Sequence, residues 1–169
     1  MKISISFLSG LLLLLPVVSF ANAITTTGSI TAFGEGSVSY TLFDQDQAGR
    51  TRISVKSRDF DTHIFLFEND GMLDASDYVT RNDDGGRGLN SLINVVLNSG
   101  SYILATSDYH LSLSEAISGY NRNNYFGDYR VKIKSKSNVS FSSVPEPTTL
   151  SLLGLGLLGV RLSQRLRKR

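Results

Sequence analysis

Apolar and polar residues alternate along several short segments between residues 38 and 133. Arg52 to Lys56 alternates strictly, so Ile53 and Val55 should face a hydrophobic core from one side of a β-strand. Residues 38–43 and 129–133 alternate in the same way. Residues 62–67 are apolar on both faces, which is typical of a central strand covered from two sides.

Two more strands are predicted at residues 92–97 and 102–106, and the Asn-Ser-Gly-Ser sequence at 98–101 indicates a tight hairpin between them. Residues 139–141 add a final edge strand, while residues 111–117 hint at a brief helix opened by Ser114 and Glu115. Regular strand spacing predicts an all-β fold, namely an antiparallel β-sandwich. A small barrel is the alternative, because periodicity does not fix how sheets close.

The same pattern predicts which side chains form the core. Some of Phe65, Phe67, Leu92 and Val96 should pack on the opposite faces of their strands. The residues expected to be buried are Ile53, Val55, Ile64, Leu66, Ile93, Val95, Ile103, Val131 and Ile133.

The first 23 residues have the pattern of a signal peptide. Lys2 supplies a positive start, residues 7–20 form an apolar stretch, and Ala21 and Ala23 flank Asn22 in a small-x-small cleavage site. Signal peptidase would leave a mature chain that begins at Ile24. An uncleaved anchor helix is the alternative, but polar residues follow Ala23 almost directly.

Residues 144–169 combine a proline motif, an apolar run and a basic tail. Val144, Pro145, Glu146 and Pro147 precede an uncharged apolar segment at residues 150–160. Each proline fixes φ and restricts the residue before it, so the motif should be extended and accessible. The basic tail, which should stay in the cytoplasm, contains Arg161, Arg165, Arg167, Lys168 and Arg169.

This order of segments resembles the PEP-CTERM sorting signal of Gram-negative bacteria. The resemblance implies export through the inner membrane and transient anchoring by the apolar helix. It also implies cleavage by an exosortase-type membrane protease, which releases the protein to the cell envelope, the outer surface or the extracellular matrix.

The net charge of the whole chain is +2, but the cations of the two terminal segments dominate this value. Residues 24–143 hold 11 Lys and Arg against 14 Asp and Glu, a net charge of −3. Four cations at positions 130, 132, 134 and 136 alternate with uncharged residues, which predicts the solvent-exposed face of one strand. No phosphate-binding groove is indicated, so nucleic acid is not expected as a partner. The chain has no cysteine, which excludes disulfides and thiolate zinc sites.

Catalytic signatures are sparse, and no catalytic residue is predicted. Neither His63 nor His110 lies in a zinc-protease motif, and no Gly-x-Ser-x-Gly elbow occurs. His63 falls in an apolar strand, where a hydrogen-bonded histidine is expected. A secreted hydrolase is one alternative, since carboxylates such as Asp59 and Asp61 could form an acidic catalytic pair. An ice- or surface-binding protein is another, although no array of regularly spaced threonines is seen beyond residues 25–27.

Two acidic loops are the candidates for metal chemistry. If the domain binds a metal, oxygen-only side chains favour Ca²⁺, which takes six to eight oxygen ligands. The alternative is that Asp, Asn and Gly serve only as turn formers. The candidate ligands are Asp70, Asp74 and Asp77 in the first loop and Asn82, Asp83 and Asp84 in the second.

The middle of the chain shows a second resemblance. Phe-Asp-Thr at 60–62, Asn-Asp-Gly at 69–71, Asp-Asp-Gly-Gly at 83–86 and Gly-Ser-Tyr at 100–102 follow one another in order. This series is similar to the bacterial prepeptidase C-terminal domain, over residues 59–108. The resemblance implies a jelly-roll-like sandwich without activity of its own. We therefore expect a structural or adhesive protein of the envelope or of a biofilm matrix, with an exopolysaccharide or surface protein as its partner.

Overall fold

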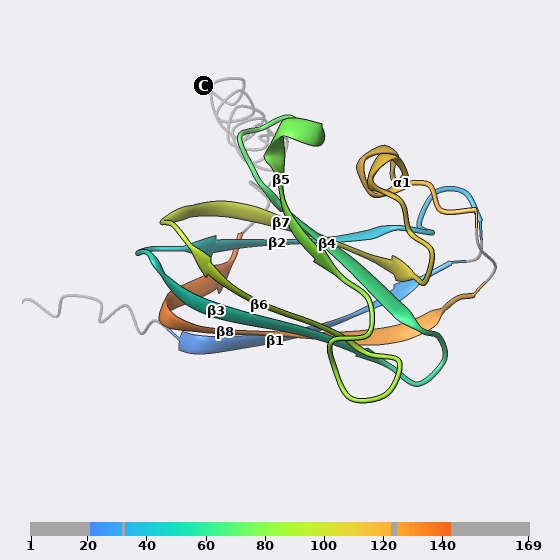
Figure 1. Cartoon of the computed structure of the whole chain (residues 1–169), viewed down its shortest axis with the longest axis horizontal. Helices are drawn as coiled ribbons and strands as arrows, with labels where there is room; N and C mark the ends of the chain where they lie inside the picture. Colours follow the sequence, from blue (N-terminus) through green and yellow to red (C-terminus); the bar gives the residue numbers. More distant parts are fainter. Residues whose placement is uncertain (1–20, 32, 123–124, 143–169) are drawn as a thin grey trace, which may run out of the picture.

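The computed structural model describes residues 21–31, 33–122 and 125–142. They form an antiparallel β-sandwich of eight strands in two facing layers (Figure 1). The predicted sorting signal at 144–169 and the apolar part of the predicted signal peptide lie outside these residues. Within the described ranges, no helix is long and apolar enough to cross a membrane.

The strands pair in the same antiparallel manner in each layer. One layer follows the order β1 (Ala21–Ile30), β8 (Gly127–Phe141), β3 (Gly49–Ser57) and β6 (Ser91–Leu97). The other follows the order β2 (Ser39–Gln45), β7 (Gly100–Asp108), β4 (Thr62–Glu68) and β5 (Tyr78–Asn82). The long strand β8 joins the layers, because its first part pairs with β1 and β3 while residues 139–141 pair with β2. This arrangement confirms the predicted β-sandwich.

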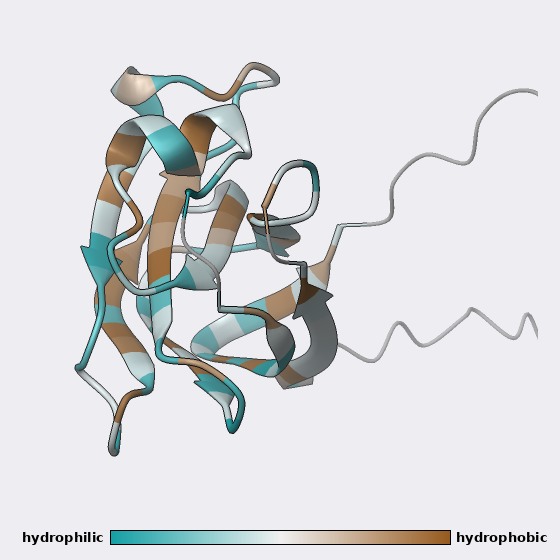
Figure 2. Cartoon of the chain, turned by 90° about the vertical axis from the view of Figure 1, so that its right-hand side faces the viewer, coloured by the Kyte–Doolittle hydropathy of each residue, from teal (hydrophilic) through white to brown (hydrophobic). Residues whose placement is uncertain are grey.

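The main core fills the space between the layers, and the strands show the corresponding alternation of polar and apolar bands in Figure 2. Val95 lies on the edge strand β6 and is only half-buried, and Ile103 is half-buried on the outer side of its sheet. The other seven residues that the sequence predicted as core are buried, namely Ile53, Val55, Ile64, Leu66, Ile93, Val131 and Ile133.

A second, smaller core covers the outer side of β4 and β7. Phe65 and Phe67 are buried there together with Leu111 and with Ala116 of α1 (Leu113–Ser118). The short 3-10 helix η1 (Ala75–Asp77) lies next to α1. Both faces of β4 are therefore buried, which explains the unbroken apolar run in its sequence. On β6, by contrast, the outward Val96 is 69% exposed.

The hairpin predicted at residues 98–101 is wrong. Strand β6 pairs with β3 in one layer, whereas β7 pairs with β2 and β4 in the other. Facing sheets lie about 10 Å apart, a distance that three or four extended residues can span. The same Gly- and Asn-rich turn signal therefore joins strands of different layers as readily as neighbours in one sheet.

The helix α1 overlaps the segment that the sequence suggests, but its N-cap is Ser112 and not Ser114. Ser112 is its N-cap, because the Ser112 hydroxyl accepts from the Glu115 amide and the Glu115 carboxylate accepts from the Ser112 amide. Gly119 ends the helix with φ of +77°, a conformation that glycine adopts without strain. Strands β1 and β5 were not predicted, and the two segments expected at 129–133 and 139–141 form the single strand β8.

Candidate functional site

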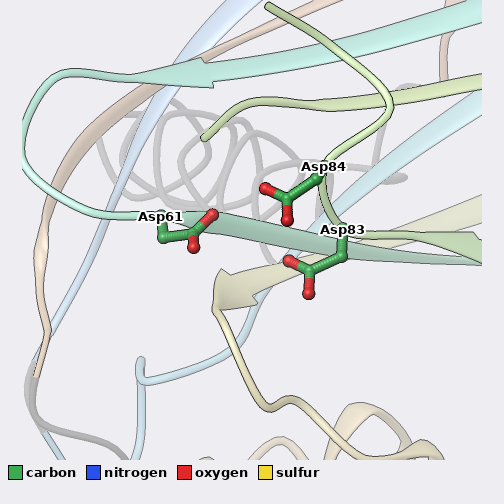
Figure 3. Close-up of side chains that lie close together, drawn as sticks. All are labelled: Asp61, Asp83 and Asp84. Carbon is green, nitrogen blue, oxygen red and sulfur yellow. The ribbon is translucent and has the colours of Figure 1, made fainter. Parts of the chain in front are cut away.

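Three carboxylates converge at one end of the sandwich (Figure 3). Asp61 stands immediately before β4, and Asp83 and Asp84 follow the end of β5. Strands β4 and β5 are antiparallel, with Ile64 opposite Asn82, so the start of one meets the end of the other. One oxygen from each carboxylate lies within 4.8 Å of an oxygen from the other two. We call these three residues the Asp61 cluster.

The Asp61 cluster is electrostatically unfavourable as a set of three anions. Asp61 Oδ1 and Asp83 Oδ1 are both buried and accept no hydrogen bond from the described residues. Burial raises the pKa of Asp61 above its ordinary value, and the negative charges of Asp83 and Asp84 raise it further. Carboxylates in this arrangement hold a proton or a cation more strongly than isolated ones do.

His63 lies next to the cluster on the outer side of β4. Its side chain is 7% exposed and stacks on Phe65, with ring centroids 5.1 Å apart. The ring nitrogen Nδ1 has no partner among the described residues, so the hydrogen bond expected there from the sequence is not formed. Burial lowers the pKa of His63, while the nearby Asp83 charge partly opposes that shift. A neutral imidazole is therefore favoured at this position.

Asn82 shapes the loop that carries Asp83 and Asp84. Its Oδ1 accepts hydrogen bonds from the Gly85 amide at 2.8 Å and from the Leu92 amide at 2.7 Å. A Cβ atom on Gly85 would lie 2.8 Å from the Leu92 carbonyl oxygen, so the loop passes too close for a larger residue. The predicted ligand Asn82 thus has a structural role, in folding the acidic loop back onto β6.

The other predicted ligands lie at the opposite end of β4. Asp70 accepts from the Met72 amide at 3.1 Å. Asp74 accepts from the Ser76 amide at 2.7 Å, and Asp77 accepts from the Asp74 amide at 2.9 Å, which closes a capping box on η1. The length of β4, about 20 Å for seven residues, separates this loop from the Asp61 cluster. One ion therefore cannot join the two loops as the sequence suggested, and these three residues serve their local turn.

An open groove of about 500 Å³ lies beside Asp61. Tyr109 and Tyr125 lie on it with ring centroids 5.8 Å apart, and Tyr125 is 54% exposed. Asp83 and Asp84 are not among its lining residues. We call this the tyrosine groove, and it is lined by Ser57, Arg58, Asp59, Phe60, Asp61, Leu89, Asn90, Tyr109 and Tyr125.

Hydrogen bonds to β7 hold the segment that carries Tyr125. The Asn121 side-chain amide donates to Ser107 Oγ at 2.8 Å and also to Asp108 Oδ1. Asp108 Oδ2 accepts from the Tyr125 amide at 3.2 Å. Ser107 and Asp108 are buried, so the position of Tyr125 is fixed from the sandwich side although its ring is exposed.

The sequence pattern does not group Asp61 with Asp83 and Asp84, and it does not identify Tyr109 or Tyr125. The pairing of β4 with β5 was the missing signal, because β5 shows no clear alternation. Had that strand been recognised, an antiparallel hairpin would have placed Asp83 beside the start of β4. The two tyrosines carry no local motif, and only the fold brings them together.

The predicted signal cleavage site lies in β1. Ala21 is opposite Val139, and a register irregularity separates Ala21 from Ala23. From Ile24 to Ile30 the strand pairs with β8 in continuous register. Cleavage after Ala23 would therefore leave the regular part of β1 intact. The predicted sorting residues Val144 to Pro147 and Arg161, Arg165 and Arg167 lie outside the described residues.

Residues 143–168 match the family model of the PEP-CTERM protein-sorting motif. The chain carries a PEP-CTERM sorting motif. The match confirms the resemblance identified in the proline motif, apolar run and basic tail. The PEP-CTERM motif implies export, sorting toward the cell surface and processing by an exosortase-type membrane enzyme.

The solved structures that are similar to the chain include the following two. The pre-peptidase C-terminal domain of collagenase from Bacillus anthracis is 19% identical, with a TM-score of 0.47 over 66% of this chain and 88% of its own. PliG from Aeromonas hydrophila, a periplasmic inhibitor of g-type lysozyme, is 13% identical, with a TM-score of 0.48 over 70% of this chain and 93% of its own. At these identities the likeness concerns the fold alone. No curated protein matches the chain.

Proposed function

We propose that the protein is an exported, non-catalytic adhesive module that acts in the cell envelope or extracellular matrix after its PEP-CTERM motif has been cut. The motif at residues 143–168 supports export and processing. The tyrosine groove carries the proposal of a binding role, because it offers the exposed ring of Tyr125, the half-buried ring of Tyr109 and several polar groups.

The tyrosine groove has the chemistry of a glycan site. Tyrosine supplies a broad rigid ring and a hydroxyl group at a small cost in side-chain entropy. Arg58, Asp59 and Ser57 add donors and acceptors at the same groove. A volume of about 500 Å³ is within the usual range for small-ligand pockets, so a short stretch of sugar chain would fit.

A secreted hydrolase is the second candidate, and one observation favours it. Asp61 has a raised pKa and lies close to two further carboxylates, which is the environment of a general acid. Hydrolysis of a glycosidic bond requires both carboxyl groups to flank the substrate. Asp59 and Asp61, the pair that the sequence suggests, both line the tyrosine groove, whereas Asp83 and Asp84 do not. Asp59 Oδ2 already accepts a hydrogen bond from the Asp128 amide at 3.0 Å, which gives that carboxylate a structural role. The geometry therefore supports binding better than catalysis.

Calcium is the cation that we propose for the Asp61 cluster. Asp61 and Asp83 each have a buried oxygen that accepts no hydrogen bond from the described residues, and Asp84 adds a third carboxylate to the cluster. Carboxylate oxygens suit a hard cation, and the cation would remove the repulsion among the three anions. The refined ligand set keeps Asp83 and Asp84 from the sequence prediction and replaces the first loop by Asp61.

Binding to a panel of neutral glycans tests the adhesive role. We expect Tyr125→Ala to abolish retention of the glycans that bind the unaltered chain, because the exposed ring is lost from the groove. Tyr120→Ala is the matched control, since Tyr120 is 45% exposed and does not line the groove.

The same samples separate binding from hydrolysis. Bound glycans should be recovered uncut after prolonged incubation. Appearance of shorter products with the unaltered chain, lost in Asp61→Asn, would establish the hydrolase instead. If no glycan is retained, or if Tyr120→Ala weakens retention as much as Tyr125→Ala, the groove is not the binding site.

A further inference from the structure

The outward face of the β3 and β8 layer carries a dense array of cations. The register places Arg52 opposite Lys134 and Lys56 opposite Arg130 on neighbouring strands. On the other side of β8, the facing positions of β1 are uncharged, with Thr25 opposite Lys132. We call this surface the cationic face, and its exposed cations are Arg50, Arg52, Lys56, Arg130, Lys132, Lys134 and Lys136.

The concentration of charge on this face is not a consequence of net charge. Residues 24–143 have a net charge of −3, yet seven of their 11 cations lie on these two strands. Like charges directly opposite one another on neighbouring strands destabilise a sheet. An anionic partner would neutralise these charges and so relieve the repulsion between the neighbouring cations.

A groove of about 420 Å³ crosses the cationic face. Arg87 joins it from the loop between β5 and β6, where the Gly86 amide donates to the Asn90 carbonyl and the Asn90 side chain donates to the Arg87 carbonyl. These bonds hold the loop beside the sheet. The groove contains no carboxylate, and its lining consists of Arg52, Ser54, Lys56, Gly86, Arg87, Asn90, Ser91, Leu92, Lys132 and Lys134.

We propose that the cationic face binds an acidic polysaccharide through this groove. Arginine presents a planar fork that matches a carboxylate with two hydrogen bonds, and lysine adds point charges. Cations two residues apart on one strand lie roughly 7 Å apart, and those opposite on neighbouring strands lie about 5 Å apart. A regular array of this kind suits a polymer that repeats its charge, and Ser54 adds a hydroxyl for sugar contacts.

Two other anionic partners fit the groove less well. Single-stranded nucleic acid is held by stacking on aromatic rings, and no aromatic residue lines this groove. A lipid surface favours apolar side chains that enter the headgroup region, and Leu92 is the sole large apolar residue of the lining. The groove on the cationic face shares only Asn90 with the lining of the tyrosine groove, so this proposal holds whether or not the tyrosine groove binds a neutral glycan.

Affinity for polygalacturonate, a polymer of carboxylated sugars, tests the proposal. The full chain is used in a non-ionic detergent, and neutral dextran of the same length is the comparison. We expect binding to polygalacturonate only, with affinity that falls as salt is added. The double variant Lys132→Glu/Lys134→Glu should raise Kd by at least about tenfold, because each lost charge-assisted contact is worth roughly that factor.

A matched control carries the same change in net charge elsewhere. Arg81→Glu/Arg122→Glu alters two exposed cations that do not line the groove, and its Kd should stay within about twofold of the unaltered chain. Lys132→Gln/Lys134→Gln provides a neutral variant with an intermediate expected loss. Equal loss in the control, equal binding of dextran, or stronger binding of oligo(dT) or of phosphatidylglycerol micelles than of polygalacturonate would overturn the proposal.

Discussion

Lys134 lies directly opposite Arg52 on the outward face of the sandwich, with both side chains exposed. We expect Lys134→Glu to raise the free energy of unfolding by about 0.2–1 kcal/mol, because an opposite-charge pair replaces a like-charge pair across the strands. Denaturant unfolding at low and high salt measures the effect, which should shrink as salt is added.

The Arg52→Ala background is the control for this pair. If the cross-strand contact is the cause, Lys134→Glu should give little stabilisation once Arg52 is absent. Equal stabilisation in both backgrounds would show that the gain comes from the overall charge of the surface.

Ile64 is fully buried between the two layers, so its truncation tests the predicted core. Ile64→Ala should lower the free energy of unfolding by about 2–5 kcal/mol, through lost burial and the cavity left behind. Val96→Ala is the control, because Val96 is 69% exposed and its truncation should change stability by less than about 0.5 kcal/mol. Similar losses in the two variants would mean that Ile64 is not in a packed core.

Much of this core was predictable because period-two alternation reports burial directly. Ile53, Val55, Val131 and Ile133 follow that rule and are buried as expected. The second core was only partly predictable, because Phe65 and Phe67 show that β4 is covered on both faces but do not show which segment covers it.

The sequence did not predict which strands pair or which acidic residues come together. Both depend on contacts between residues that are far apart in the chain. The segment at 98–101 looks like a hairpin turn, yet Leu97 and Tyr102 face one core from opposite layers. In the same way, Asp83 is 22 positions from Asp61 and reaches it only through the β4–β5 pairing.

Asp61 should make stability depend on pH in the absence of metal. Burial and the charges of Asp83 and Asp84 raise its pKa, so the folded state binds the proton more tightly than the unfolded chain. The resulting stabilisation is complete below the ordinary carboxyl pKa of about 3.9 and is lost as pH rises through the higher folded pKa. Asp61→Asn should therefore be the more stable protein at pH 7 with chelator, and thermal unfolding across this pH range should show that advantage disappearing in acid.

Calcium should make the unaltered chain more stable than Asp61→Asn, which is the reverse of their order of stability with chelator. A ligand that binds only the folded state stabilises it by about 2.7 kcal/mol at a hundredfold excess over Kd, so the unaltered chain should gain thermal stability when Ca²⁺ is added. Asp61→Asn and Asp83→Ala should lose that response. Asp70→Asn, in the other acidic loop, should retain it. An unchanged midpoint in the unaltered chain, or loss of the response in Asp70→Asn, would contradict the Asp61 cluster as the binding site.

His63 gives a prediction with the opposite dependence on pH. Burial lowers its pKa, so stability is retained above the ordinary histidine pKa of about 6.5 and falls as pH drops toward the lower folded value. His63→Phe should keep the stacking on Phe65, remove the unpartnered Nδ1 and abolish this fall. Chemical denaturation at pH 7.5 and pH 5 compares the two proteins. A parallel loss of stability in both would assign the acid sensitivity to another group.

We expect the chain to be exported and cut at its PEP-CTERM motif. Residues 150–160 would span about 16 Å as a helix, well short of a hydrocarbon core of about 30 Å, which suits a transient anchor. Intact mass spectrometry of the protein from a bacterium that contains an exosortase is the most direct measurement. We predict a major species that begins at Ile24 and ends near Pro147. A major species that still carries Arg169 would show that the motif is not cut.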